Sequence, residues 1–245
     1  TIKVSETTTG MGTVVQKTVY MKEEEAGKEL FAEINSCLQL YEKELLSWRE
    51  SESEIAKINA SAGSEQGYEV QSEELMDCLQ IIWQVSEKSN GALDVTVGMV
   101  TKAWNIDKWA TGDKELFQMP DEEELRVLLQ NVGYQKVRME EGKIYLPVQM
   151  TLDLGAVGKG IVCDRIGEYL KVQDAVTGAV ITVGGSVVTY GTKPDGGAWN
   201  IAIVNPRKEG YYLGKISVAG EYYIATSGDY ERYVEKDGIR YHHIM

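Results

Sequence analysis

Cysteine and histidine, which form many metal and catalytic sites, are scarce in this sequence. Its 245 residues include only three cysteines, and no two of them form a C-x-x-C pair, so a zinc or dithiol site is not expected. Cys37, Cys78 and Cys163 each fall in a predicted helix, where we expect them to serve as small buried hydrophobic residues. The only two histidines, His242 and His243, are neighbours near the C-terminal end.

Positive charge and long apolar runs are also lacking. The sequence has 25 Lys and Arg against 38 Asp and Glu, which gives a formal net charge of −13. Sequence-independent binding of nucleic acid depends on Lys and Arg that neutralise phosphates, so no nucleic-acid partner is expected. An anionic ligand would need a local positive pocket or a metal ion. No apolar run approaches the ~20 residues of a membrane-spanning helix.

The pattern of polar and apolar residues predicts mainly helices in the first half of the chain and strands in the second. Helices are expected over Glu23–Trp48, from the N-cap Ser72 to Asn90-Gly91, from Pro120 to near Gly133, and from about Lys159 to Leu170. Strands are expected over Thr13–Tyr20, Ala179–Val183, Val187–Tyr190, Trp199–Val204, Lys215–Val218 and Tyr222–Ala225, with hairpins turning at Glu141-Gly142 and Asp237-Gly238. This order favours an α+β fold over a doubly wound sheet, in one large domain or two small lobes.

The segment 151–161, TLDLGAVGKGI, has the character of an anion-binding loop. Three glycines let the backbone approach a ligand, a helix N-terminus follows, and Lys159 adds a full positive charge. The spacing matches neither a Walker A loop nor a dinucleotide-binding fingerprint. The segment is equally compatible with an ordinary glycine-rich turn that leaves Lys159 in solvent. Asp153 would then be a strand-end residue that binds nearby amides, or else an acid that supports the site.

Several other short segments have an ordinary explanation when each is taken alone. Ser53 and Glu54 are typical of a helix start, and Asn59 of its end. Asp94 and Thr96 lie on the same side of an extended segment, where they could contact a ligand or satisfy a turn.

The strand-rich second half contains three further segments of this kind. Gly184-Gly185 separates two apolar strands and predicts a tight hairpin. Thr226–Tyr230, TSGDY, precedes the histidine pair. Adjacent residues of a strand point to opposite faces, so only one of His242 and His243 is expected to face a given site. Such a histidine serves either as a base or in packing.

The order and spacing of these segments closely resemble those of the FAD:protein FMN transferases, the ApbE-like flavin transferase family. The resemblance extends from Met11 to Met245 and is carried by Met11-Gly12-Thr13, Ser53-Glu54…Asn59, Leu93–Gly98…Trp104, Leu152–Ala156…Lys159-Gly160…Asp164, Gly184-Gly185, Trp199…Pro206, Thr226–Tyr230 and His242-His243-Ile244.

The resemblance implies both a fold and an activity. The fold would be a two-lobed α+β domain spanning 1–245, with FAD bound between the lobes. Such enzymes use Mg²⁺ to split the FAD pyrophosphate, move FMN onto a Thr or Ser hydroxyl of a target redox protein, and release AMP. Some members instead hydrolyse FAD to FMN and AMP. A third alternative is a flavoprotein that binds FAD without chemistry.

The resemblance also implies roles for individual residues. The backbone carbonyl of Ala156 would bind the metal, with Asp153 close by. His243 would be the general base, a role suited to the ordinary histidine pKa of about 6.5. The residues that would line or shape the FAD site are Met11, Ser53, Glu54, Asn59, Asp94, Thr96, Lys159, Gly184, Gly185, Thr226, Ser227 and Gly228.

The sequence departs from the family at its C-terminal side. The family's chain continues past the histidines and completes the metal site with an Asp and a Thr in a D-A-x-[ST]-T-like segment, which this sequence does not contain. We therefore expect the C-terminal part of the family domain to be missing, and the chain alone to bind metal poorly and to bind FAD without turnover. The resemblance also implies an extracytoplasmic, membrane-associated lipoprotein, with an N-terminal lipid anchor that was removed. The sequence itself starts at Thr1, with neither Met nor a signal peptide.

Overall fold

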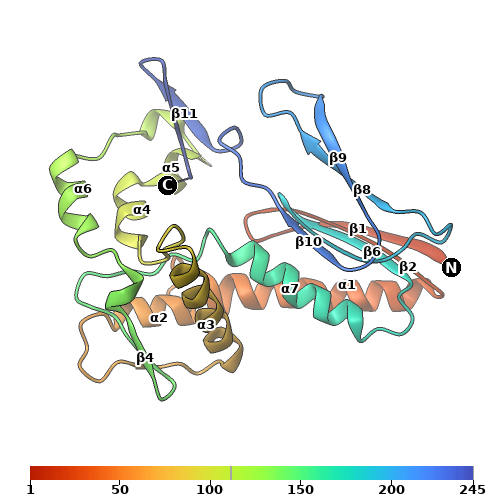
Figure 1. Ribbon diagram of the computed structural model, residues 1–245, viewed down its shortest axis with the longest axis horizontal. Helices are drawn as coiled ribbons and strands as arrows, with labels where there is room; N and C mark the ends of the chain where they lie inside the picture. Colours follow the sequence, from red (N-terminus) through yellow and green to blue (C-terminus); the bar gives the residue numbers. More distant parts are fainter. Residues whose placement is uncertain (111, 245) are drawn as a thin grey trace. The chain divides into compact units, whose positions relative to one another are not determined.

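The computed structural model describes residues 1–110 and 112–244, which fall into two compact units (Figure 1). The first unit joins Thr1–Glu42 to Gly158–Tyr230, and the second joins Lys43–Val157 to the residues from Glu231 onward. Each unit is therefore built from two stretches of chain that are distant in sequence. The mixture of helices and antiparallel sheets confirms the α+β class.

The first unit is a five-stranded antiparallel sheet covered by two helices. The strands follow the order β1-β2-β6-β7-β10 across the sheet. Their bounds are Ile2–Gly10 (β1), Thr13–Met21 (β2), Gly178–Val183 (β6), Ser186–Gly191 (β7) and Tyr222–Ala225 (β10). Helices α1 (Glu24–Gln39) and α7 (Gly158–Lys171) pack on the sheet and on each other (Figure 1). Val15, Val19 and Ile181 of the strands and Ile34 and Ile166 of the helices are fully buried, so the core lies between sheet and helices.

A two-stranded ribbon belongs to the same unit. It consists of β8 (Trp199–Val204) and β9 (Tyr212–Val218), which pair with each other and with no other strand in the described part of the chain. Trp199 anchors the base of the ribbon, because its ring is buried and its Nε1 donates to the carbonyls of Tyr190 and Gly191 at 3.3 and 3.2 Å. An isolated ribbon is marginally stable in water, so this anchor matters for its order.

The second unit is mainly helical. Its helices are α2 (Glu54–Ala60), α3 (Glu73–Lys88), α4 (Gly98–Trp104), α5 (Ile106–Ala110) and α6 (Glu122–Leu129), with 3₁₀ turns η2 (Lys114–Leu116) and η3 (Tyr134–Lys136). Its strands are β3 (Tyr68–Glu69), β4 (Arg138–Glu140) and β5 (Lys143–Tyr145) in one small sheet, and the hairpin of β11 (Tyr233–Lys236) and β12 (Ile239–His242). Trp109, Phe117 and Val234 form a buried cluster, and Tyr241 packs on Phe117 with ring centroids 4.9 Å apart. This aromatic cluster attaches the C-terminal hairpin to α5.

None of the helices in residues 1–110 and 112–244 combines the length and the apolar character needed to cross a bilayer.

The structure differs from the sequence-based expectations in several details. Strand β1 was not expected, because its Thr-rich sequence lacks a strong apolar alternation and forms an exposed sheet edge. The predicted helix Glu23–Trp48 continues past α1 as a π-helix over Leu40–Leu46 (η1). Cys78 is half-buried, unlike the other two cysteines. His243 follows strand β12 in a bend, so the alternation argument does not apply to it.

A charged side chain lies inside the first unit. Lys17 on β2 is fully buried, and its Nζ pairs with the Glu6 carboxylate, donates to Asn35 Oδ1 and donates to Thr8 Oγ1 at 2.9 Å. The three ammonium hydrogens thus have three oxygen partners, which compensates the loss of water.

The same contact makes stability depend on pH. A side-chain hydrogen bond from Lys17 holds the pKa of Glu6 below its ordinary value. A carboxyl whose pKa is lowered by folding contributes stability above its unfolded pKa and loses it as pH falls through its folded pKa. We expect Glu6→Gln to unfold at a lower temperature than wild type near pH 7, and the difference in Tm to shrink below about pH 4. Thermal unfolding from pH 3 to 7 tests this, and a constant difference would contradict it.

Two serines of helix α3 and its N-cap lie in opposite environments. Ser72 is its N-cap, and its Oγ accepts from the Leu75 amide at 3.1 Å. Ser86 is fully buried, and its Oγ has no hydrogen-bond partner among the described residues. An unsatisfied buried hydroxyl destabilises a fold, whereas a cap stabilises it.

We therefore expect opposite effects from the same substitution in one helix. Ser86→Ala should raise the free energy of unfolding by about 1 kcal/mol, because it removes the unpaired hydroxyl and improves helix propensity. Ser72→Ala, the matched control, should lower it by about 1 kcal/mol. Urea unfolding measures both, and a destabilised Ser86→Ala would show that this hydroxyl is satisfied in solution.

Candidate functional site

Three turns that carry predicted FAD-site residues meet at one end of the five-stranded sheet. Met11-Gly12 joins β1 to β2, Gly184-Gly185 joins β6 to β7, and Thr226 directly follows β10. Backbone hydrogen bonds connect them, since Gly184 donates to β2 at 3.0 Å and Thr226 donates to the Gly185 carbonyl at 2.9 Å. Residues more than 200 positions apart in sequence therefore form one continuous edge.

Glycine is required where these turns touch. Gly184 has a φ of 58°, and a Cβ there would lie 2.7 Å from Thr13 Oγ1. A Cβ on Gly185 would lie 2.7 Å from Thr226 Oγ1. A side chain at either position would push a neighbouring turn away, so the paired glycines set the spacing of the whole edge.

An acid from the π-helix fixes the first turn. Glu42 accepts hydrogen bonds from the amides of Met11 at 2.9 Å and Gly12 at 3.1 Å. These two amides are therefore engaged within the protein. The structure assigns Met11 a fixed place at the edge of the sheet, and its side chain is half-buried there.

The segment Thr226–Gly228 has no regular secondary structure. Thr226 Oγ1 donates to the Gly185 carbonyl at 3.0 Å, and Ser227 is exposed. The Tyr230 ring fills the space where a side chain on Gly228 would lie. This segment therefore keeps its shape through contacts at its two ends.

Lys159 lies in the first turn of α7. The other end of α7 leads through residues 172–177 to the start of β6, at the end of the sheet opposite the Gly184-Gly185 turn. Helix α7 spans ~21 Å and β6 ~20 Å, so the start of α7 lies towards the three turns. The partial positive charge of the helix N-terminus and the Lys159 ammonium both favour an anion at this end.

In the second unit, Asn59 holds the strand-like start of the TLDLGAVGKGI segment. Its Oδ1 accepts from the Leu152 amide at 2.7 Å, and its Nδ2 donates to the Leu152 carbonyl at 3.0 Å. The Asn59 side chain thus makes the two hydrogen bonds that the backbone of a neighbouring strand would make. Gly98 supports the preceding carbonyl: its amide donates to the Thr151 carbonyl at 2.9 Å, and a Cβ on Gly98 would lie 2.5 Å from that oxygen.

Asp153 shapes the turn that follows. Its Oδ1 accepts from the Gly155 amide at 2.8 Å, and its Oδ2 accepts from Thr101 Oγ1 at 2.9 Å. The expectation that Asp153 binds a nearby amide is confirmed. Both carboxylate oxygens are engaged, and the bond to Thr101 connects the turn to α4.

Ser53 and Glu54 hold the start of α2. Ser53 is buried, its Oγ accepts from the Ala56 amide at 3.1 Å, and it donates to the Ser47 carbonyl. Glu54 is also buried, and its carboxylate accepts from the amides of Gln71 and Ser72. The N-cap predicted at Ser53 is confirmed.

Asp94 and Thr96 form a turn. Asp94 Oδ1 accepts from the Thr96 amide at 2.9 Å and from its hydroxyl at 2.6 Å. Asp94 Oδ2 accepts from the Tyr134 amide at 2.9 Å, and Thr96 Oγ1 accepts from the Gly133 amide at 2.8 Å. Of the two explanations left open by the sequence, the structure supports the turn, and a contact with FAD stays a prediction.

Ala156, the predicted carbonyl ligand of Mg²⁺, is exposed in the turn before α7. No three His, Cys, Asp or Glu side chains gather as a metal site anywhere in the described residues. Mg²⁺ prefers octahedral oxygen coordination and often combines one or two protein groups with substrate phosphates. The described residues therefore do not by themselves fit a preformed Mg²⁺ site.

His243 is held by the backbone of the C-terminal hairpin. Its amide donates to the Arg232 carbonyl at 3.2 Å, and its Nδ1 lies 3.4 Å from the same oxygen. A carbonyl only accepts, so this contact favours the tautomer with the proton on Nδ1. Nε2 is then the ring nitrogen that can take a proton, as a general base requires.

Trp48 lies in a cluster of charged side chains that the sequence did not indicate. Trp48 follows η1, and two cations lie over its ring: the Arg49 guanidinium, 4.3 Å from the ring centroid, and the Lys102 ammonium, 5.0 Å from it. Its Nε1 is buried without a hydrogen-bond partner among the described residues. Arg49 in turn pairs with Asp107. An aromatic at a helix end resembles an ordinary core residue in sequence, so only the neighbouring Arg49 could have indicated this cluster.

The cysteine in α7 is excluded as a nucleophile. Burial raises the pKa of the Cys163 thiol to about 12, so the reactive thiolate is essentially absent at neutral pH. The expectation that Cys163 is a small buried hydrophobic residue is confirmed.

The two bonds of Asn59 lead to a prediction. Asn59→Asp keeps the acceptor for the Leu152 amide but sets a carboxylate oxygen against the Leu152 carbonyl. We expect the free energy of unfolding to fall by about 2–3 kcal/mol at pH 7, and by less below about pH 4, where a protonated Asp can donate again. Urea unfolding at the two pH values measures this. Equal losses at both would show that the donor to Leu152 is unimportant.

The profile of the ApbE family matches residues 11–245. The FAD:protein FMN transferase of Vibrio cholerae is 31% identical over 219 residues, covering 89% of this chain and 63% of the relative. The protein of the same name from Treponema pallidum is 31% identical over 255 residues, covering 96% of this chain and 67% of the relative. The chain thus spans about two thirds of the length of these curated relatives.

Solved structures show the same fold. The crystal structure of the ApbE protein from Thermotoga maritima has a TM-score of 0.87 at 27% identity and covers 100% of this chain and 76% of that one. The flavin transferase ApbE from Vibrio cholerae has a TM-score of 0.81 at 26% identity, with the same coverage of 100% and 76%. The fold expected from the sequence resemblance is therefore confirmed.

Proposed function

Because the chain belongs to the ApbE family, we propose that the protein transfers FMN from FAD to an acceptor protein and releases AMP. The observation that supports this most directly is the edge of the five-stranded sheet. There the turns at Met11, Gly184-Gly185 and Thr226 meet near the start of α7, which carries Lys159. Close backbones, a helix N-terminus and a lysine together suit a pyrophosphate.

The proposed acceptor group is a Thr or Ser hydroxyl of a redox protein. In this reaction the hydroxyl oxygen forms a bond to the phosphorus of the FMN half, and the bond from that phosphorus to the AMP oxygen breaks. AMP leaves with the electron pair of the broken bond. The hydroxyl proton passes to Nε2 of His243.

The protein's own charges assist this step. Lys159 and the N-terminus of α7 stabilise the negative charge of the pyrophosphate. We propose Mg²⁺ as the metal, with the Ala156 carbonyl as one ligand, and it would neutralise phosphate oxygens when bound.

The two neighbouring histidines provide a test of the proposed base. In the full-length protein, with FAD, Mg²⁺ and a peptide that carries a Thr or Ser acceptor, His243→Asn should lower the transfer rate by about 10²–10⁴-fold. FAD affinity should stay within about threefold, because the base acts on the acceptor hydroxyl. The FMN mass increment on the peptide and the released AMP measure transfer, and fluorescence titration measures binding. His242→Asn is the matched control and should retain transfer.

The same assay separates the alternatives. AMP formed without modification of the peptide would indicate an FAD pyrophosphatase, in which water replaces the hydroxyl. FAD binding without AMP would indicate a binding protein. Equal losses in the two histidine variants would contradict the role of His243.

A further inference from the structure

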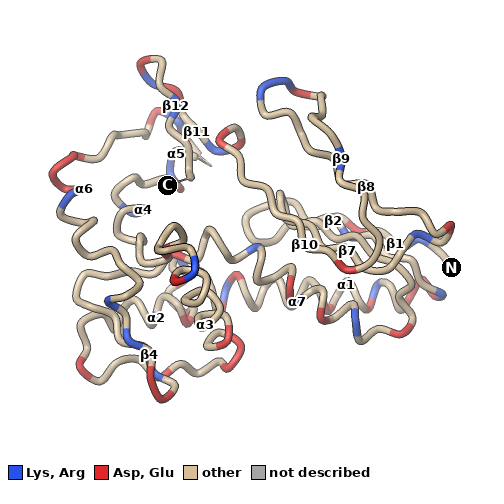
Figure 2. The backbone as a smooth tube through the Cα atoms, in the orientation of Figure 1, with Lys and Arg blue, Asp and Glu red and all other residues tan. Residues whose placement is uncertain are grey.

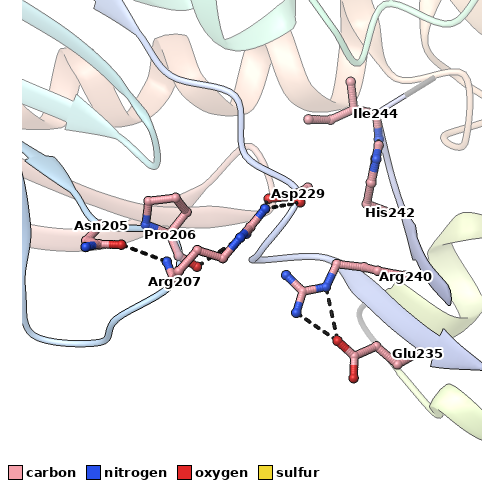
Figure 3. A network of polar contacts seen from close by, with 8 residues as sticks. All are labelled: Asn205, Pro206, Arg207, Asp229, Glu235, Arg240, His242 and Ile244. Atoms are coloured by element: carbon pink, nitrogen blue, oxygen red, sulfur yellow. Dashed lines mark hydrogen bonds and ion pairs between the residues drawn. The ribbon is translucent and has the colours of Figure 1, made fainter. Parts of the chain in front are cut away.

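The ion pair between Arg207 and Asp229 joins two loops of the first unit (Figure 3). The guanidinium donates two parallel hydrogen bonds, from Nη1 to Oδ1 at 2.9 Å and from Nη2 to Oδ2 at 2.8 Å. Arg207 itself is fixed, because its amide donates to Asn205 Oδ1 at 2.9 Å. This two-pronged geometry determines direction as well as distance.

One loop carries Arg207, and the other carries Asp229. Arg207 lies in the loop between β8 and β9, where Figure 2 shows a blue stretch of Lys and Arg. Asp229 directly follows Gly228, the last residue of the Thr226–Gly228 segment. The other end of this segment is held by Thr226, whose amide and hydroxyl both donate to the Gly185 carbonyl.

The segment is therefore held by contacts at its two ends, and it is not itself part of a helix or a strand. One tie leads to the glycine turn of the sheet, and the other leads to Arg207. The ribbon that presents Arg207 is itself fixed at its base by the buried Trp199. The β8–β9 ribbon is thus anchored at its base by Trp199 and at its tip by the Arg207–Asp229 pair, and it supports the Thr226–Gly228 segment.

We infer that Arg207 is a positioning residue for FAD: through Asp229 it holds the Thr226–Gly228 segment in the shape that receives the dinucleotide. The inference rests on the proposed function, since it takes this segment to be part of the FAD site. A segment ordered before the ligand arrives does not lose conformational freedom on binding, so affinity gains. The pair also neutralises Asp229, which would otherwise place a free carboxylate beside an anionic ligand.

Because the ion pair is exposed, its effect on the stability of the fold can be distinguished from its effect on FAD binding. The side chains are 60% (Arg207) and 31% (Asp229) exposed, and exposed ion pairs contribute little to folding. Breaking the pair should shift Tm by less than about 4 °C. A structural role alone would change Tm without a matching loss of FAD affinity.

The experiment is a titration of the full-length protein and its variants with FAD, followed by thermal unfolding of each. We expect Arg207→Gln and Asp229→Asn each to weaken FAD binding by about tenfold. The double variant Arg207→Asp/Asp229→Arg should recover to within about threefold of wild type, because the pair is restored in reverse. Arg126→Gln is the matched control: it breaks the exposed pair with Glu122 in α6, changes net charge as Arg207→Gln does, and should bind FAD as wild type does.

Asp229→Asn is the decisive variant. If charge alone mattered, removing a carboxylate near an anion would leave FAD binding unchanged or tighten it, whereas loss of positioning weakens it. Unchanged or tighter binding, failure of the reversed pair to recover, or a fall in Tm well beyond 4 °C would each overturn the inference. A wild-type protein that binds no FAD would overturn the proposed function as well, and is recognised before any variant is compared.

Discussion

The close approach of backbones at the Gly184-Gly185 turn is the constraint on which the first unit's site depends. The turn donates to β2 on one side and accepts from Thr226 on the other, so it fixes the ends of three strands at once. Because the contacts lie where Cβ atoms would be, no other residue type allows this spacing. The sheet is rigid, and the close contacts at the two glycines hold the adjoining loops, where a ligand would bind, in fixed positions.

Polar residues of the second unit act mainly on the backbone. Glu54 binds two amides, Asn59 replaces a strand partner, and Asp94 closes a turn. Each bond satisfies a donor or acceptor that burial would otherwise leave unpaired, and each fixes a loop in one conformation. Side chains of this kind can be essential to a site without touching the ligand, because they order the loops that do.

Local features were predictable from the sequence, and long-range pairings were not. The caps at Ser53 and Ser72 and the turn at Gly184-Gly185 follow from chemistry within a few residues. The surroundings of Trp48 depend on Lys102, and the role of Asn59 depends on Leu152, 93 positions away. Strand β1 escaped prediction because an edge strand is selected by pairing with its neighbour and not by its own hydrophobicity. The family resemblance bridged this gap by supplying the order of the motifs, which local propensity cannot.

The proposed function requires a chain with a net charge of −13 to accept an anion, and the arrangement of its acids is consistent with this. Three acids that touch or belong to segments expected to contact the ligand are engaged locally: Glu42 by two amides, Asp153 by an amide and a hydroxyl, and Asp229 by Arg207. A carboxylate that accepts such bonds has its charge compensated where it lies, so it repels a phosphate less than a free one would. Lys159 and the start of α7 then set the local potential. The net charge describes the protein as a whole, whereas anion binding depends on how charges are arranged at one end of one sheet.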